Sequence, residues 1–320
     1  MTMPHPMPHA DQSAEASLRD ALSRGDLVLG KIGPILGHLL STPDHSLFSD
    51  EIVARVRGML HDLAWQVLRA QAQAAGQSGR EAFAERHGEA LAEHLQASPA
   101  LLAHCHALAL EWQFASRMEA QYGLDPVLSP LIQQLIAAED SAISSAAMAA
   151  LAAQARFAQT QQRMELPLAE LPGDLFHQTL LGWRNYNGPN QSDAMIRAEA
   201  KLRDGFDESG GRIALFARLV AGLGDDATEA LVLDKAGAAI FFTSLAARSG
   251  QSREMAILSS NKRQLVRLAL GLRAAGLDGV ELEDVIMRIH PDAAPPQSVL
   301  AVTPSEAQQL LTEGGMLGIG

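Results

Sequence analysis

The sequence predicts an all-α protein with no β-sheet, built from stacked helical hairpins in the manner of an α-solenoid. Aromatic residues make up only 4% of the chain, whereas alanine, the strongest helix former, is abundant. No stretch of alternating β-branched and aromatic residues is bounded by turn residues, as a strand would be. Three glycines, Gly224, Gly250 and Gly276, each follow an apolar helical run at a spacing of 26 residues. Together these observations predict helices throughout and an internal repeat in the last third of the chain.

Length, composition and net charge exclude several classes of protein. A chain of 320 residues, 47% hydrophobic and 19% charged, has room for about two globular domains. The net charge of −12 argues against binding to nucleic acids and to anionic membranes, which need a surplus of basic residues. The one cysteine, Cys105, excludes an internal disulfide, and Met1 to Ala10 lack the pattern of a signal peptide. We therefore expect a cytoplasmic protein that does not span a membrane.

The N-terminal part is predicted to be a short tail followed by a helical domain. Residues 1–12 carry three prolines and no periodicity, which indicates a disordered tail. Residues 13–188 are assigned to one helical domain, with a kink expected at Gly33-Pro34. Its helix starts are predicted from capping residues and from proline at the first helical position: Ser13, Asp26, Ser49 or Asp50, Ser78 with Glu81 as a capping box, Ser98-Pro99, Asp125-Pro126 and Ser129-Pro130.

An alanine-rich helix over 140–164 is expected at the centre of this domain. It starts at Asp140, and its small side chains suggest that neighbours pack closely on more than one side. A further helix begins at Asp174 and ends in Asn187-Gly188-Pro189-Asn190, the strongest turn signal in the chain. This turn is interpreted as a domain boundary.

Residues 192–290 are predicted to form the helical repeats. After a first helix capped by Ser192, each repeat has a helix that stops at a glycine and a second, shorter helix. The second helices are predicted to begin at Asp225 or Asp226, Ser252 and Asp278. Stacked pairs would bury a shared core, although the short period also fits a compact bundle. Residues 291–320 are expected to form a loop, a short helix capped by Thr303 and Glu306, and a flexible tail.

From about residue 129 to residue 290 the chain resembles an uncharacterised alphaproteobacterial family of all-helical, HEAT-like proteins. The resemblance is carried by the alanine-rich helix, by Glu170-Leu171-Pro172 and by the glycine-punctuated repeats. It implies a helical-repeat fold, and the family has no established activity or functional residues to carry over to this chain.

The segment 246–273 is the candidate binding face. Its small residues, the turn at Gly250 and the apolar Ile257 also fit a DNA-reading helix-turn-helix. Against one acidic residue, Glu254, it carries six basic residues: Arg248, Arg253, Lys262, Arg263, Arg267 and Arg273. Three interpretations remain open, namely a DNA-reading face, a face that docks a protein, and an ordinary solvated surface.

No familiar catalytic, metal or cofactor motif is found. Successive helical residues diverge by about 100°, so His104-Cys105-His106 cannot converge on one ion, and a buried thiol is expected. His87 and His94 share a helix face but stand about 10 Å apart along the axis. Ser209-Gly210-Gly211-Arg212 fits a capping turn better than a phosphate loop. The tryptophans are expected to anchor the core: Trp65, Trp112 and Trp183.

The sequence therefore predicts a non-enzymatic helical scaffold or adaptor that binds another protein, without cofactor or metal. The alternative is a nucleic-acid-binding or transcriptional regulator that uses the segment 246–273.

Overall fold

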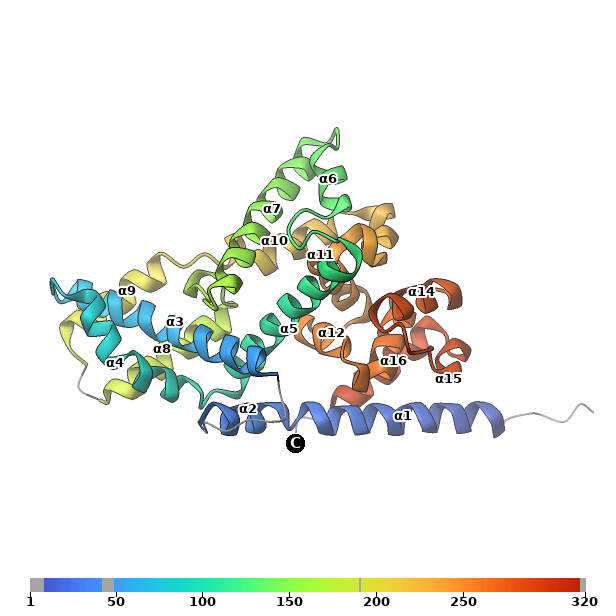
Figure 1. Cartoon of the computed structure of the whole chain (residues 1–320), viewed down its shortest axis with the longest axis horizontal. Helices are drawn as coiled ribbons and strands as arrows, with labels where there is room; N and C mark the ends of the chain where they lie inside the picture. The colour runs from blue at the N-terminus through green and yellow to red at the C-terminus, as the bar shows by residue number, and fades with distance from the viewer. Residues whose placement is uncertain (1–8, 42–48, 190, 317–320) are drawn as a thin grey trace, which may run out of the picture. The chain divides into compact units, whose positions relative to one another are not determined.

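The computed structural model describes residues 9–41, 49–189 and 191–316 of the chain (Figure 1). The structure is 80% helical, and the described residues include no strand, so the predicted all-α class is confirmed. The chain divides into two compact units, which are described separately below.

Unit 2 comprises residues 32–230 and 234–240. Its elements in chain order are α2 (Ile32–Ser41), α3 (Asp50–Ala74), α4 (Arg80–Leu95), α5 (Pro99–Tyr122), α6 (Pro130–Ile136), α7 (Ser141–Gln162), η1 (Leu168–Glu170), α8 (Gly173–Asn187), α9 (Asp193–Asp204), η2 (Glu208–Gly210), α10 (Arg212–Ala221) and most of η3 (Gly224–Leu231).

Helix α3 organises the core of unit 2. It packs against α4, α5, α8 and α9, and one of its faces is fully buried through residues such as Val56, Leu60, Leu63 and Val67. These positions recur at intervals of three and four residues, which places them on one side of a helix. The indole of Trp183 from α8 lies fully buried in the same core. Trp112 of α5 is also buried in this core, whereas Trp65 of α3 is only partly buried and packs against it.

Most predicted helix starts of unit 2 are confirmed, because capping is a local interaction. The side chains of Ser49, Ser98, Ser129, Asp140 and Ser192 each accept a hydrogen bond from a backbone N–H group of the following helix.

Other predicted starts are wrong. Gly79, not Ser78, caps α4, and the carboxylate of Glu81 pairs with Arg69 instead of completing a capping box. Asp125-Pro126 starts no helix, because the Asp125 carboxylate accepts the backbone N–H groups of Val127 and Leu128 and so closes a turn.

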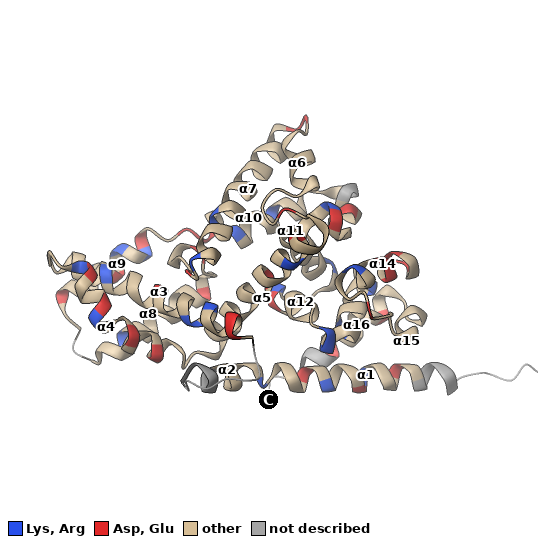
Figure 2. Ribbon diagram, viewed as in Figure 1, with Lys and Arg blue, Asp and Glu red and all other residues tan. Residues whose placement is uncertain are grey.

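The alanine-rich helix α7 matches the predicted span but is not packed on several sides. Only one stripe of α7 is buried, and it includes Ala147, Ala150, Phe157 and Ala158. The opposite side is solvent-exposed, with Met148 58% exposed. Figure 2 shows that α7 carries almost no charge along most of its length. Alanine propensity can hold such a helix with one buried stripe, so small side chains do not require close neighbours all round.

Unit 1 comprises residues 1–31, 231–233 and 241–320. It contains α1 (His9–Leu29), most of α11 (Leu233–Ser249), α12 (Arg253–Ser259), η4 (Lys262–Gln264), α13 (Leu265–Ala274), α14 (Gly279–Ile289), α15 (Gln297–Ala301) and α16 (Pro304–Met316). Helix α1 packs against α13, α15 and α16. Along α1, basic and acidic residues alternate and pair one turn apart, as in Arg19 with Glu15 (Figure 2).

Both predicted terminal segments differ from the structure. The tail predicted over 1–12 covers residues 1–8, which lie outside the described residues, and residues 9–12, which belong to α1. Helix α1 continues to Leu29 and α2 begins at Ile32. The helical conformation is therefore interrupted at residues 30–31 rather than at Gly33-Pro34. The described part of the segment 291–320, which ends at residue 316, contains two helices, α15 and α16. Thr303 and Glu306 form the predicted capping box, but α16 reaches Met316.

The three repeat glycines all have the positive φ that favours glycine, namely 52° at Gly224, 70° at Gly250 and 100° at Gly276. Gly250 ends α11, and the following N–H, of Gln251, bonds back to the Ala246 carbonyl. The chain after Gly276 makes the same bond to α13. Both ends are therefore Schellman caps. Gly224 differs, since α10 already ends at Ala221.

The helix pairs after the glycines are only partly as predicted. Ser252 and Asp278 cap α12 and α14, but the segment after Gly224 is the 3-10 helix η3, and the side chains of Asp225 and Asp226 lie outside the described ones. The first pair also belongs to unit 2 and the other two to unit 1. The division of the chain thus falls after residue 230 rather than at the predicted turn 187–190, because α9 and α10 pack on α3 and α7.

Candidate functional site

Most of the six basic residues of the predicted binding face form hydrogen bonds or ion pairs within unit 1. Arg248 donates from Nε to the carbonyl oxygen of Ala275 at 2.8 Å, which lies at the end of α13. Arg273 donates to the carbonyl oxygens of Val302 at 2.8 Å and Leu277 at 3.0 Å. Cationic side chains suit these positions because the last carbonyls of a helix are unsatisfied and carry partial negative charge.

Arg267 is the most deeply buried of the six. Its side chain is 2% exposed and forms an ion pair with Asp26 of α1, more than 200 positions away in the sequence. It also donates to Gln251 at 3.2 Å. Arg253 is half-buried and donates from Nε to the Thr243 hydroxyl at 3.2 Å.

Of the six basic residues, the remaining two are Lys262 and Arg263, both in η4. Their side chains are exposed and form no hydrogen bond or ion pair with other described residues. Arg263 and Arg267 line a small pocket of about 250 Å³ beside Arg24 of α1. The structure therefore does not bring the six residues together on one exposed surface.

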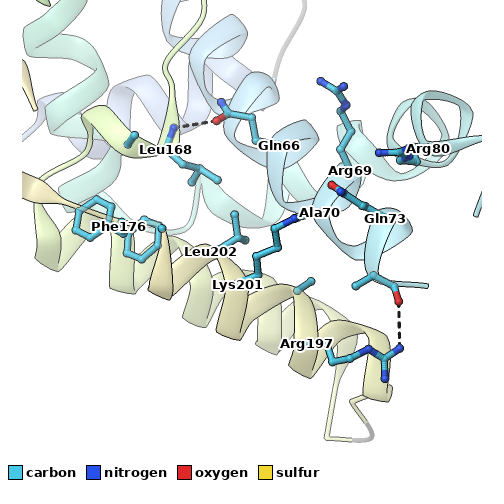
Figure 3. Close-up of a pocket in the computed structure, with 15 residues that line it drawn as sticks. Gln66, Arg69, Ala70, Gln73, Arg80, Leu168, Phe176, Arg197, Lys201 and Leu202 are labelled. Carbon is cyan, nitrogen blue, oxygen red and sulfur yellow. Dashed lines mark hydrogen bonds between the residues drawn. The ribbon is translucent and has the colours of Figure 1, made fainter. Parts of the chain in front are cut away.

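A larger basic groove lies in unit 2 (Figure 3). It has a volume of about 660 Å³, within the range of roughly 300–1,000 Å³ typical of ligand sites. We define it by its lining residues: Gln66, Arg69, Ala70, Gln73, Ala74, Arg80, Leu168, Ala169, Phe176, Arg197, Ala198, Lys201, Leu202, Gly205 and Phe206. Four of these are basic and none is acidic, in a chain of net charge −12.

Helical periodicity places the polar lining. Gln66, Arg69 and Gln73 lie on the side of α3 that does not enter the core, because they fall between the buried positions at intervals of three and four. Arg197 and Lys201 of α9 are one turn apart and face the same groove, as Figure 3 shows. Arg80 is the first residue of α4.

The four cations differ in how far they are already engaged. Arg69 pairs with Glu81 at 3.0 Å and lies over the Trp65 ring, and Arg197 donates to the Ala74 carbonyl at 3.0 Å. Within the described part of the chain, Arg80 and Lys201 form no ion pair. The exposed Arg69–Glu81 pair is of a kind that contributes little, about 0–1 kcal/mol, so its arginine can be recruited by a ligand.

The one buried carboxylate of α9, Glu199, does not neutralise the groove. Burial opposes its ionisation, but hydrogen bonds from Arg184 and Arg203 hold the pKa of Glu199 below its usual range. Its charge is therefore balanced by two arginines that do not line the groove, and it does not cancel the positive charge of Arg197 and Lys201.

The other end of the groove is apolar. The rings of Phe176 and Phe206 stack at 4.0 Å between centroids, with Leu168 and Leu202 beside them in the lining. In Figure 3, Phe176 and Arg80 lie at opposite ends of the site. The groove thus offers a site for one apolar group next to a site for anionic groups.

A second pocket of about 390 Å³ lies beside the groove in unit 2. Its polar lining includes Arg156, Arg163, Arg212 and Glu170. Arg212 is 3% exposed, and its guanidinium donates twice to the Glu111 carboxylate, each time at 2.8 Å. The same guanidinium lies 3.7 Å from the centroid of the Phe157 ring.

Sequence reasoning missed both sites in unit 2. The basic residues of the groove come from α3, α4 and α9, and local sequence patterns do not predict that these three helices pack together. The one local indication of the groove is that Arg197 and Lys201 stand one helical turn apart on α9. The sequence pattern places Arg212 in a capping turn, whereas its buried pairing with Glu111 depends on a contact across about 100 positions.

The chemically suggestive residues of α5 lie in the core. Cys105 is fully buried, and burial raises the pKa of its thiol to about 12, so it stays protonated at neutral pH. Burial lowers the pKa of His106 to about 4. No three His, Cys, Asp or Glu side chains come close enough to hold a metal ion in the ranges that the structure describes. None of the described helices is both long and apolar enough to cross a bilayer.

Comparison with known proteins gave no match to a family model, to a curated protein or to a solved structure. The resemblance to the HEAT-like family therefore stays a prediction.

Proposed function

We propose that this protein is a helical adaptor that binds an acidic segment of another protein in the basic groove of unit 2. The observation that supports this proposal is the lining of the groove: four basic residues and no acidic one, beside an apolar end. A matching segment carries glutamate or aspartate side chains next to one apolar side chain.

Charge complementarity favours such a partner over nucleic acid. Phosphate backbones are bound by many cations spread over a wide surface, whereas the groove holds four cations around one cavity. We do not propose nucleic-acid binding through the segment 246–273, because Arg248, Arg267 and Arg273 are engaged in bonds that hold unit 1 together.

A peptide-binding measurement with two charge-reversal variants tests the proposal. The probe is a fluorescein-labelled peptide of about six residues, with one phenylalanine followed by three glutamates. Lys201→Glu in the groove is compared with Lys262→Glu on η4, which makes the same change at an exposed site outside the groove.

We expect Lys201→Glu to weaken binding at least tenfold, equivalent to about 1.4 kcal/mol, and Lys262→Glu to change it less than twofold. Binding should also weaken with added salt. Equal effects of the two variants, or equal binding of a peptide in which lysines replace the glutamates, would show that the groove does not select acidic segments.

A further inference from the structure

The basic groove and the second pocket are neighbours along one chain segment. Ala169 of η1 lines both cavities. The groove is also lined by Leu168, and the second pocket by Leu166, Pro167 and Glu170. The segment 166–170 therefore forms a ridge between two cavities of about 660 and 390 Å³.

The ridge is low where the two cavities meet. Ala169 is exposed, and its side chain is a single methyl group. An extended peptide can cross at this point without displacing a large side chain.

Hydrogen bonds fix the ridge on α3. The Gln66 side chain donates to the Leu166 carbonyl at 2.9 Å and accepts the Leu168 N–H at 2.9 Å. Asp62 accepts the Leu166 N–H at 2.9 Å. Since these bonds hold the backbone in one position, both cavities keep a fixed relation to each other, and binding need not order the ridge.

The second pocket adds two exposed arginines, Arg156 and Arg163, each beside one glutamate. Arg156 and Arg163 are 55% and 60% exposed, so both can reach a ligand. Their present partners compete weakly. Arg156 lies 3.8 Å from Glu170, and Arg163 pairs at 2.7 Å with the nearby Glu165 on the surface. The remaining arginine of this pocket, Arg212, is already neutralised by Glu111.

We infer that the acidic segment bound in the groove is an extended one that crosses Ala169 and places a second acidic group against Arg156 and Arg163. This inference rests on the proposed function and names the form of the partner: a segment with two acidic clusters rather than a single short motif. Two linked contacts bind more tightly than either alone, because the second contact forms within the same complex.

The test compares two labelled peptides on the full-length protein. The short probe is the peptide of about six residues described above, and the long probe extends it to about fourteen residues with a second run of three glutamates. Extensions are made at either end in separate peptides, since the direction of the segment in the groove is not assumed. We expect one of the two long probes to bind at least tenfold more tightly than the short one.

Three variants separate the two sites. Arg156→Gln combined with Arg163→Gln should remove most of the gain of the long probe and leave the short probe within twofold. Ala169→Glu places a negative charge at the crossing point and should weaken the long probe more than the short one. Lys201→Gln should weaken both probes.

The outcomes distinguish the inference from the function on which it rests. If Lys201→Gln weakens both probes but neither long probe exceeds the short one, the groove is confirmed and the extended segment is refuted. The extended segment is also refuted if the double arginine variant leaves binding of the long probe unchanged. If Lys201→Gln weakens neither probe, the proposed function itself fails. Circular dichroism spectra of all variants, expected to match the wild type, confirm that these exposed substitutions leave the fold intact.

Discussion

The buried pair of Arg212 and Glu111 is the interaction on which the stability of unit 2 should depend most sharply. Both side chains are almost completely buried, at 3% and 1% exposure, and two hydrogen bonds of 2.8 Å join them. Gln154 accepts a further bond from the same guanidinium at 3.1 Å, and the Phe157 ring covers it. We predict that Glu111→Gln, which keeps the size of the side chain and removes its charge, destabilises unit 2 severely.

The expected magnitude follows from what the substitution leaves behind. A buried guanidinium without its counter-charge costs about 3–5 kcal/mol, which is a large part of the roughly 5–15 kcal/mol that stabilises a typical domain. For a unit of about 200 residues, this corresponds to a fall in Tm of roughly 10 °C. Replacing both partners by methionine removes the desolvation penalty together with the attraction. The double variant should therefore lie within about 2 kcal/mol of the wild type.

Urea unfolding followed by circular dichroism measures these differences. The control is Glu81→Gln, which breaks the exposed pair of Glu81 with Arg69 and should cost less than about 1 kcal/mol. The reasoning is refuted if Glu111→Gln costs no more than this control. It is also refuted if the double methionine variant loses as much stability as Glu111→Met and Arg212→Met lose in sum, because the cost would then come from lost packing rather than from an uncompensated charge.

Two further predictions concern single residues. Burial raises the pKa of Asp62 to about 6, so the folded protein holds this proton more tightly than the unfolded chain. The free energy of unfolding should therefore fall by roughly 1–2 kcal/mol between pH 4 and pH 7 on account of this group, and Asp62→Asn should remove that part of the pH dependence in urea titrations. Arg267→Gln leaves Asp26 without its partner and should loosen α1, seen as faster hydrogen exchange of the α1 amides than in the control Arg263→Gln. Equal exchange in the two variants would contradict this role.

Local chemistry explains which parts of the fold could be predicted. The caps at Ser49, Ser98 and Asp140 and the stop at Gly250 depend on residues within one turn of the helix end, so the sequence pattern alone indicates them. The errors arose where two local solutions compete. Asp125 has the sequence of a helix cap and instead closes a turn.

Packing over long distances in the sequence explains what could not be predicted. Helix α1 joins the C-terminal helices because Asp26 meets Arg267 and because the Gln264 side chain donates to the Gly25 carbonyl. No local pattern in either segment signals the other. The same holds for Arg212, whose partner Glu111 lies in a helix about 100 residues earlier.

The sequence by itself determined that the chain is helical, where many of its helices begin and end, and that it is acidic overall. Only the tertiary structure decided which basic residues are free to bind. It engages Arg248, Arg267 and Arg273 in internal bonds and gathers Arg80 and Lys201 at one groove. The physical reason is that the interaction between two charged groups weakens with the distance between them. The packing of the helices determines which groups lie within a few ångströms of each arginine or lysine.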